Sequence, residues 1–88
     1  KGNGSAPARA NAVGQRIGQM DAAVSWDTEN AVGAVILWGH APNKLYHSRM
    51  VYGANSGRIT ALIAGEKAFA RVDTFNEGGV TEGVVFEL

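Results

Sequence analysis

The sequence has no cysteine and no long apolar run. The absence of cysteine excludes a disulfide framework, a thiolate metal site and a thiol nucleophile, although it does not decide the compartment. No segment reaches the ~18 consecutive apolar residues of a membrane-spanning helix, and none has the charged start and apolar centre of a signal peptide. We therefore predict a chain without a membrane partner.

An excess of charge of one sign is also lacking, because eight basic residues balance eight acidic ones. A nucleic-acid-binding domain normally carries a basic surface, and an acidic tail would show as a run of carboxylates. Neither is present, so we predict no nucleic-acid partner.

What the chain does have is a globular composition in a short length. Its 88 residues are 45% hydrophobic and 18% charged and include 12 glycines, which fits one small domain with one core and many tight turns. Residues 1–6, KGNGSA, are polar and rich in glycine, so we predict a linker or frayed terminus there and a folded domain over residues 7–88. Because the chain starts with Lys1 rather than methionine, we expect a fragment or a processed chain.

The clearest structural pattern is an alternation within residues 67–83. Small or apolar side chains occupy every second position at Ala68, Ala70, Val72 and Thr74. This period of two places them on one face of a β-strand. The segment NEGG at residues 76–79 contains residues that tolerate positive φ, so we predict that the chain turns there and that residues 80–88 return as the second strand of a hairpin.

Shorter strands are predicted along the rest of the chain. They cover residues 21–27, 31–38, 45–52 and 58–63, each bounded by polar or glycine-containing turns. Residues 7–20 show helical spacing of apolar side chains, but Gly14 and Gly18 interrupt it, so we predict an irregular first strand and a loop. Short strands with turns about every ten residues indicate an all-β antiparallel sandwich of about seven strands, with Trp26 and Trp38 in the core.

In the order of these residues the chain resembles a fibronectin type III domain. The resemblance runs from about residue 20 to the end and is carried by Trp26, Gly33, Leu62, Gly65, Val72, Asn76 and Gly78 or Gly79. It implies an immunoglobulin-like sandwich. Two positions depart from the family pattern. Ala68 stands where the family has a tyrosine whose hydroxyl closes the corner before the sixth strand, and Ala34 stands where an aromatic residue is usual.

A narrower resemblance is to the fibronectin-like domains appended to bacterial glycoside hydrolases of the β-xylosidase and arabinofuranosidase kind. WGHAPNKLYHS at residues 38–48 and RVDTFNEGGVTEG at residues 71–83 are similar to segments of such domains. This resemblance implies a non-catalytic accessory domain of a secreted or periplasmic enzyme of carbohydrate metabolism. Its partner would be the adjacent catalytic domain of the same parent chain.

Groups that could carry catalysis or bind a metal are sparse. His40 and His47 flank a turn, but no third ligand follows at a typical spacing. Asp73, Glu77 and Glu82 could gather on one face of a sheet, yet an open face offers no cleft to raise the pKa of one carboxyl group, as a glycosidase pair requires. We predict that this chain is not itself an enzyme and uses no cofactor or metal.

Exposed aromatic rings would point to a different function, that of a carbohydrate-binding module. The candidate carbohydrate contacts are Tyr46, His47 and Tyr52, whereas Trp38 is predicted to face the core. We keep weak polysaccharide contact through these three residues as the alternative to a purely accessory role.

The outer face of two neighbouring strands carries the candidate interface. Alternation places Val35, Leu37, Phe69 and Phe75 there. A contiguous apolar patch generally marks contact with another protein surface. We predict that these four residues pack against the adjacent domain, with two alternatives: a homodimer of the isolated fragment, or cover by a loop or by the N-terminal segment.

Overall fold

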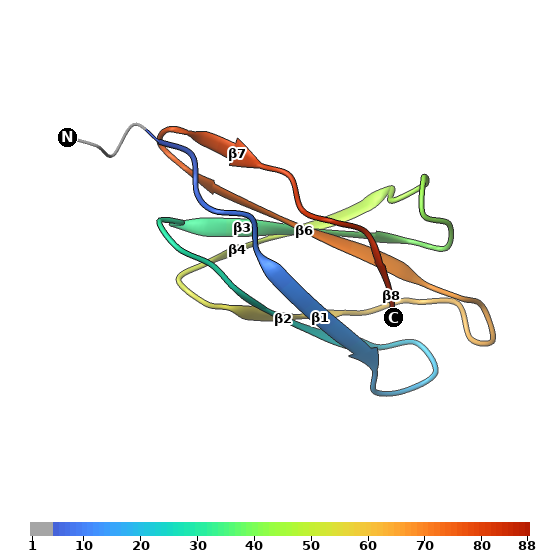
Figure 1. Ribbon diagram of the computed structural model, residues 1–88. Helices are drawn as coiled ribbons and strands as arrows, with labels where there is room; N and C mark the ends of the chain where they lie inside the picture. The colour runs from blue at the N-terminus through green and yellow to red at the C-terminus, as the bar shows by residue number, and fades with distance from the viewer. Residues whose placement is uncertain (1–4) are drawn as a thin grey trace.

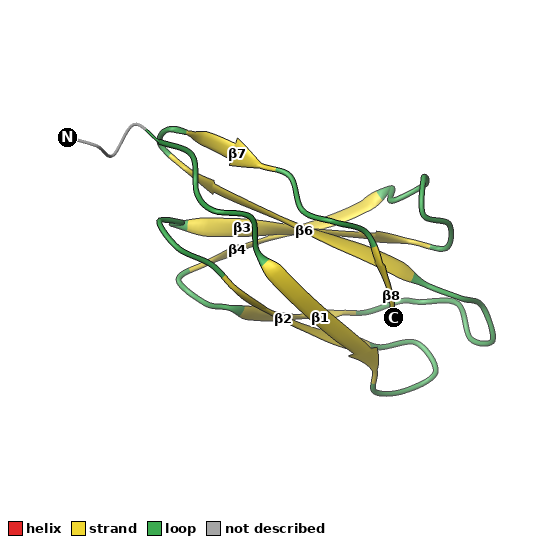
Figure 2. Cartoon of the chain, in the orientation of Figure 1, coloured by secondary structure: helices red, strands yellow, loops and turns green. Residues whose placement is uncertain are grey.

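The computed structural model describes residues 5–88, all in strands and connections without a helix (Figure 2). Residues 1–4, most of the predicted linker, lie outside the described residues. The strands are β1 (Asn11–Arg16), β2 (Ala22–Asp27), β3 (Gly33–Gly39), β4 (His47–Tyr52), β5 (Ser56–Ile59), β6 (Phe69–Asn76), β7 (Gly79–Thr81) and β8 (Phe86–Glu87). Within this part of the chain no helix is long and apolar enough to cross a membrane.

The strands form two antiparallel sheets that pack face to face (Figure 1). One sheet has the order β1-β2-β5, and the other has the order β4-β3-β6-β7 with β8 also paired to β6. The predicted all-β sandwich is therefore confirmed. An eighth strand is present because the predicted return of residues 80–88 is divided into β7 and β8.

The division of the return strand centres on Gly83. A Cβ atom at this position would lie 2.1 Å from the carbonyl oxygen of Val72, so the backbone passes too close to β6 for any side chain. The amide of Gly83 donates to Oδ1 of Asp73 at 2.9 Å. The carboxylate of Asp73 thus accepts the hydrogen bond that a backbone carbonyl would accept in a regular strand pair. The pairing of the return strand with β6 is interrupted here.

The core lies between the two sheets and uses the predicted face of β6. Ala68, Ala70, Val72 and Thr74 are all at most 1% exposed. They pack with buried side chains that include Val24, Trp26, Ile36, Ile59 and Leu62. The alternation seen in the sequence therefore marks the core face, and Trp26, at 4% exposure, is an inward anchor as predicted.

Trp38 differs from this expectation, because it is only partly buried. It points to the inner side, but its neighbour on β4 is His47, and the two rings stack with centroids 5.6 Å apart. β4 is the edge strand of its sheet. His47 is exposed and lies on an edge strand, so it does not shield Trp38 from solvent as a buried neighbour would.

Both ends of β5 also differ from the prediction. The strand expected at residues 58–63 is β5, which begins two residues earlier and ends at Ile59. It can begin earlier because Gly57 packs directly under Ile36, where a Cβ atom would lie 2.7 Å from Cδ1. It ends early because Ala61 has a positive φ of 63°, which is incompatible with a continuing strand. The first strand is β1, so the strand interpretation of residues 7–20 is confirmed over helix.

The corner between β5 and β6, where Ala68 stands at the position of the tyrosine that the resemblance implies, is held by two side chains from other parts of the chain. Arg16, at the end of β1, donates from Nη2 to the carbonyl oxygen of Ile63 at 2.8 Å and from Nη1 to that of Glu66. Nδ1 of His40 lies 2.8 Å from the carbonyl oxygen of Lys67, and Nε2 of the same ring lies 3.3 Å from the amide nitrogen of Ile63. Since a carbonyl can only accept, Nδ1 carries the proton and Nε2 accepts.

The segment before β1 is also hydrogen-bonded to the sandwich. Thr74 donates to the carbonyl of Ala8 at 3.1 Å, and the Asn76 side chain donates to that of Ser5 at 2.8 Å. Segments from opposite ends of the sequence are therefore joined along this edge of the fold (Figure 1).

Candidate functional site

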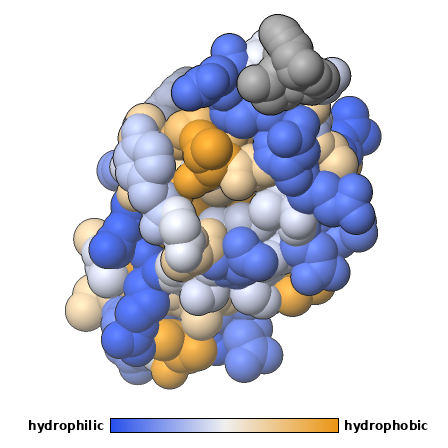
Figure 3. Space-filling view, turned by 90° about the vertical axis from the view of Figure 1, so that its left-hand side faces the viewer, coloured by the Kyte–Doolittle hydropathy of each residue, from blue (hydrophilic) through white to orange (hydrophobic). Residues whose placement is uncertain are grey.

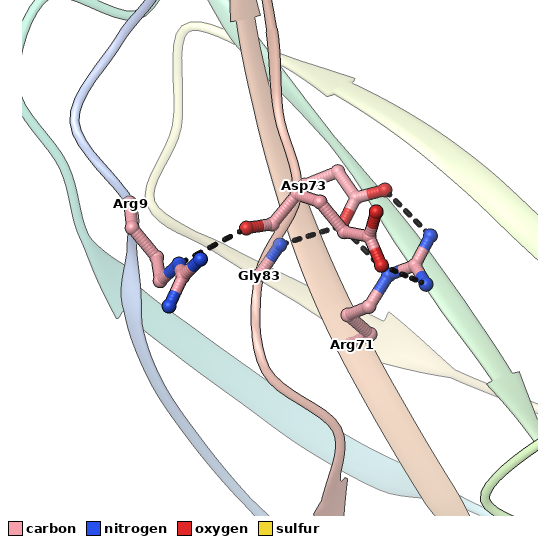
Figure 4. A network of polar contacts seen from close by, with 5 residues as sticks. Arg9, Arg71, Asp73 and Gly83 are labelled. Carbon is pink, nitrogen blue, oxygen red and sulfur yellow. Dashed lines mark hydrogen bonds and ion pairs between the residues drawn. The ribbon is translucent and has the colours of Figure 1, made fainter.

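The candidate carboxylates form part of a polar network on the outer face of β6 (Figure 4). Asp73, 8% exposed, receives hydrogen bonds from Nε and Nη2 of Arg71, both at 2.8 Å, and from the amide of Gly83. Glu82 accepts from Nη1 of Arg71 at 3.0 Å, and its backbone carbonyl accepts from Arg9 at 3.2 Å. Asp73 and Glu82 therefore meet through a shared arginine, whereas Glu77 lies at the β6–β7 turn outside the network.

The charged groups of this network pair with one another. The hydrogen bond to Asp73 raises the pKa of Arg71 above its ordinary value, against the opposing effect of burial, and the negative charges of Asp73 and Glu82 add to the increase. A glycosidase pair needs one carboxyl group free to hold a proton at the reacting bond. Here Arg71 lies between the two carboxylates, which makes the network a structural clamp.

The four predicted interface residues all lie on the outer face but fall into two groups. The strand register pairs Gly33 with Phe75 and Gly39 with Phe69. The two phenylalanines are six residues apart on β6, which corresponds to roughly 20 Å. Arg71 and Asp73 occupy the same face between them. Phe75 is thus diagonal to Val35, and Phe69 is diagonal to Leu37; each of these four side chains is partly buried.

Around Phe75 the apolar surface is larger than the sequence indicated. The ring of Tyr52 meets Phe75 edge-on, with centroids 5.6 Å apart and planes at 84°. Met50 lies opposite Val35 on β4, and Val80 lies opposite Phe75 on β7. We call this set the Phe75 surface: Val35, Met50, Tyr52, Phe75 and Val80. Met50, Tyr52 and Val80 are 55%, 66% and 67% exposed.

The candidate carbohydrate contacts are divided in space. Tyr52, the last residue of β4, belongs to the Phe75 surface, whereas His47 begins β4 and Tyr46 directly precedes it. Tyr46 is 80% exposed, and His47 is held against Trp38 by ring stacking with planes 20° apart. These two residues border an open hollow of about 310 Å³ at the β3–β4 connection. Its lining consists of Gly39, His40, Ala41, Lys44, Tyr46 and His47.

The two histidines do not form a metal site with other side chains in residues 5–88, where no group of three or more potential ligands gathers. Both ring nitrogens of His40 are engaged with the backbone of the β5–β6 corner. His40 therefore has a structural role that its position before a turn did not reveal.

One end of the sandwich is shown in Figure 3, where the left-hand side of Figure 1 faces the viewer. Hydrophilic side chains cover most of this end, and hydrophobic side chains appear in small separate areas (Figure 3). Polar residues therefore separate the apolar ones on the part of the surface that this view shows.

The fold is similar to that of fibronectin type III domains of known structure. The fibronectin domain of human collagen XX superposes with a TM-score of 0.80 at 22% identity, covering 93% of this chain and 88% of that one. A fibronectin domain of human contactin 1 gives a TM-score of 0.68 at 18% identity, covering 96% of this chain and 78% of that one. No protein-family model matches the sequence, and no curated protein sequence matches it. The likeness therefore establishes the fold.

Proposed function

We propose that this fibronectin type III-like domain is a non-catalytic accessory domain of a secreted or periplasmic polysaccharide-degrading enzyme. In this role it packs against the adjacent catalytic domain of the same parent chain and fixes the geometry between the two. The resemblance of residues 38–48 and 71–83 to such domains supports this class of parent. The Phe75 surface supports the packing role.

The Phe75 surface supports packing because its members are large, apolar and adjacent across four strands. Tyr52, Phe75 and Val80 follow one another across the sheet, with only Gly33 between the first two. A monomer seldom leaves a contiguous apolar surface in water, and such surfaces generally mark protein contacts. Tyrosine and methionine are also enriched at the centres of interfaces, where their side chains bury much area.

The neighbouring polar network supports the same role. Arg71 and Asp73 hold each other and the return strand beside the Phe75 surface. A surface on paired strands that are clamped in this way is rigid before binding, which reduces the conformational entropy lost on association.

The test compares two double variants in the intact parent chain. Tyr52→Ser with Val80→Ser alters the Phe75 surface, and Tyr46→Ser with Val13→Ser removes the same two residue types from other exposed positions. We expect the first variant to release the domain earlier in limited proteolysis, because the contact with the catalytic domain is lost. The second variant should behave as the wild type.

Equal release rates for both variants and the wild type would overturn the proposed packing. The isolated 88-residue chain gives the homodimer alternative its own measurement. A concentration-dependent dimer in sedimentation equilibrium that is abolished by Tyr52→Ser with Val80→Ser would assign the surface to a second copy instead.

A further inference from the structure

The hollow at the β3–β4 connection combines an aromatic wall with a single cation. Tyr46 is 80% exposed, so most of its ring is free for contact. Apart from the two histidines, Lys44 is the one ionisable basic residue in the lining, and no aspartate or glutamate borders the hollow. The volume of about 310 Å³ lies at the lower end of the range of about 300–1,000 Å³ typical of small-molecule sites.

The walls of the hollow are fixed by contacts that do not use its interior. His40 is held by two hydrogen bonds to the β5–β6 corner, and His47 is stacked on Trp38. Gly39 lies so close to Lys44 that a Cβ atom would be 2.0 Å from the carbonyl oxygen of Lys44. The backbone on both sides of the hollow is thus tightly joined, and the hydrogen bond from the Lys44 amide to Ala41 closes the turn.

The ring of His47 adds directional polarity. Within residues 5–88 no hydrogen bond joins the ring of His47 to another residue, and His47 is exposed. Its face is occupied by Trp38, so its ring nitrogens at the edge are the groups that can meet a ligand. A ligand that fits all three features has an apolar face for Tyr46, hydroxyl groups for His47 and a negative charge for Lys44.

We propose that this hollow binds a sugar unit that carries a carboxylate, as in an acidic oligosaccharide built from hexuronic acids. The apolar face of the sugar ring packs on Tyr46, the carboxylate pairs with the ammonium group of Lys44, and a ring hydroxyl bonds to His47. Charge complementarity selects the acid over its neutral counterpart. This site is separate from the Phe75 surface, because Tyr46 directly precedes β4 whereas Tyr52 is its last residue.

The same geometry explains why we expect no binding of neutral, insoluble polymers. A crystalline or sheet-like polysaccharide needs a flat row of aromatic rings. Tyr46, just before β4, and Tyr52, its last residue, are six positions apart, at most roughly 20 Å of extended chain, and Ser48 and Met50 lie between them in the sequence. A hollow with one exposed ring accommodates a single sugar unit at a time.

The experiment is an NMR titration of the labelled 88-residue chain with trigalacturonate and with the neutral galactotriose. We expect saturable shifts at the amides of residues 39–47 with trigalacturonate, and binding of galactotriose that is weaker by about tenfold, a difference of ~1.4 kcal/mol. Raising the salt concentration should weaken the binding of the acid, because an exposed ion pair is screened.

Three variants identify the groups responsible. Tyr46→Ala should weaken binding of trigalacturonate by about tenfold or more, and Lys44→Gln should remove the preference for the acid over the neutral sugar. Tyr52→Ala is the matched control, since it removes a tyrosine of similar exposure from the Phe75 surface and should change nothing. No saturable shift, shifts that map to the Phe75 surface, equal binding of both trisaccharides, or full binding by Tyr46→Ala would each overturn the proposal.

Discussion

Arg71 and Asp73 are two positions apart on one strand, and their side chains form a bidentate pair with both nitrogen-oxygen distances at 2.8 Å. Residues two apart in a strand point to the same face, so the pair forms along β6 rather than across the sheet. The second lone pair of Asp73 Oδ1 is left for the amide of Gly83 at 2.9 Å. One carboxylate thus connects the strand to the break in the return strand.

Removing the Asp73 carboxylate should therefore destabilise the C-terminal half of the sandwich. Asp73→Ala leaves Arg71 partly buried with only the exposed Glu82 as a partner, and it leaves the amide of Gly83 without an acceptor. We expect a loss of about 2–4 kcal/mol in the free energy of unfolding, measured by urea denaturation. Glu82→Gln is the control, because its side chain is 69% exposed and its ion pair should contribute less than about 1 kcal/mol. Equal losses for the two variants would contradict the clamp.

A methyl group at Gly83 should also destabilise the contact between β6 and the return strand. In Gly83→Ala the new Cβ atom would meet the Val72 carbonyl at 2.1 Å, so β6 and the return strand must separate. We expect a loss of roughly 1–3 kcal/mol in thermal or urea unfolding. Gly18→Ala is the matched control, since no atom lies within 4 Å of its Cβ position. That variant should be neutral or stabilising by about 0.4–1 kcal/mol. A neutral Gly83→Ala would show that the close approach is not needed.

The features that were predictable from the sequence depend on the period of a single strand. The alternation from Ala68 to Thr74 and the inward direction of Trp26 need no knowledge of neighbouring strands. The edge-on contact of Tyr52 with Phe75 depends on the registers of both β4 with β3 and β3 with β6. The residue pattern within one strand does not determine how two pairs of strands are aligned. The sequence therefore indicated an apolar outer face but not which residues of β4 and β7 would extend it.

The break at Gly83 and the corner were missed for a related reason. Both depend on contacts between residues far apart in the chain, and Arg16 reaches a carbonyl 47 positions away. The sequence did show that Ala68 removes the usual tyrosine. It could not show which distant side chains would supply the missing hydrogen bonds.

The corner gives a prediction that can be measured at one backbone amide. His40→Ala removes the acceptor of the Ile63 amide, so this proton should exchange with solvent at least several-fold faster in hydrogen-exchange NMR. The loss in stability should be about 1 kcal/mol, because the hydrogen bonds of His40 are exposed. The neighbouring Leu62 amide donates to the Met20 carbonyl at 2.9 Å and should keep its protection. Unchanged exchange at Ile63 would show that His40 does not hold the corner.

The two tryptophans should differ in their contribution to stability, although the sequence placed both in the core. Trp26 is 4% exposed between the sheets, so Trp26→Ala creates a large cavity and should cost about 3–5 kcal/mol. That loss is comparable with the whole stability of a small domain, which is at least about 5 kcal/mol. Trp38 is partly buried against His47, so Trp38→Ala leaves space that water can enter and should cost about half as much. Urea denaturation followed by far-ultraviolet circular dichroism measures both variants without relying on tryptophan fluorescence. A cooperatively folded Trp26→Ala protein that is more stable than Trp38→Ala would mean that Trp38, and not Trp26, is the main anchor of the core.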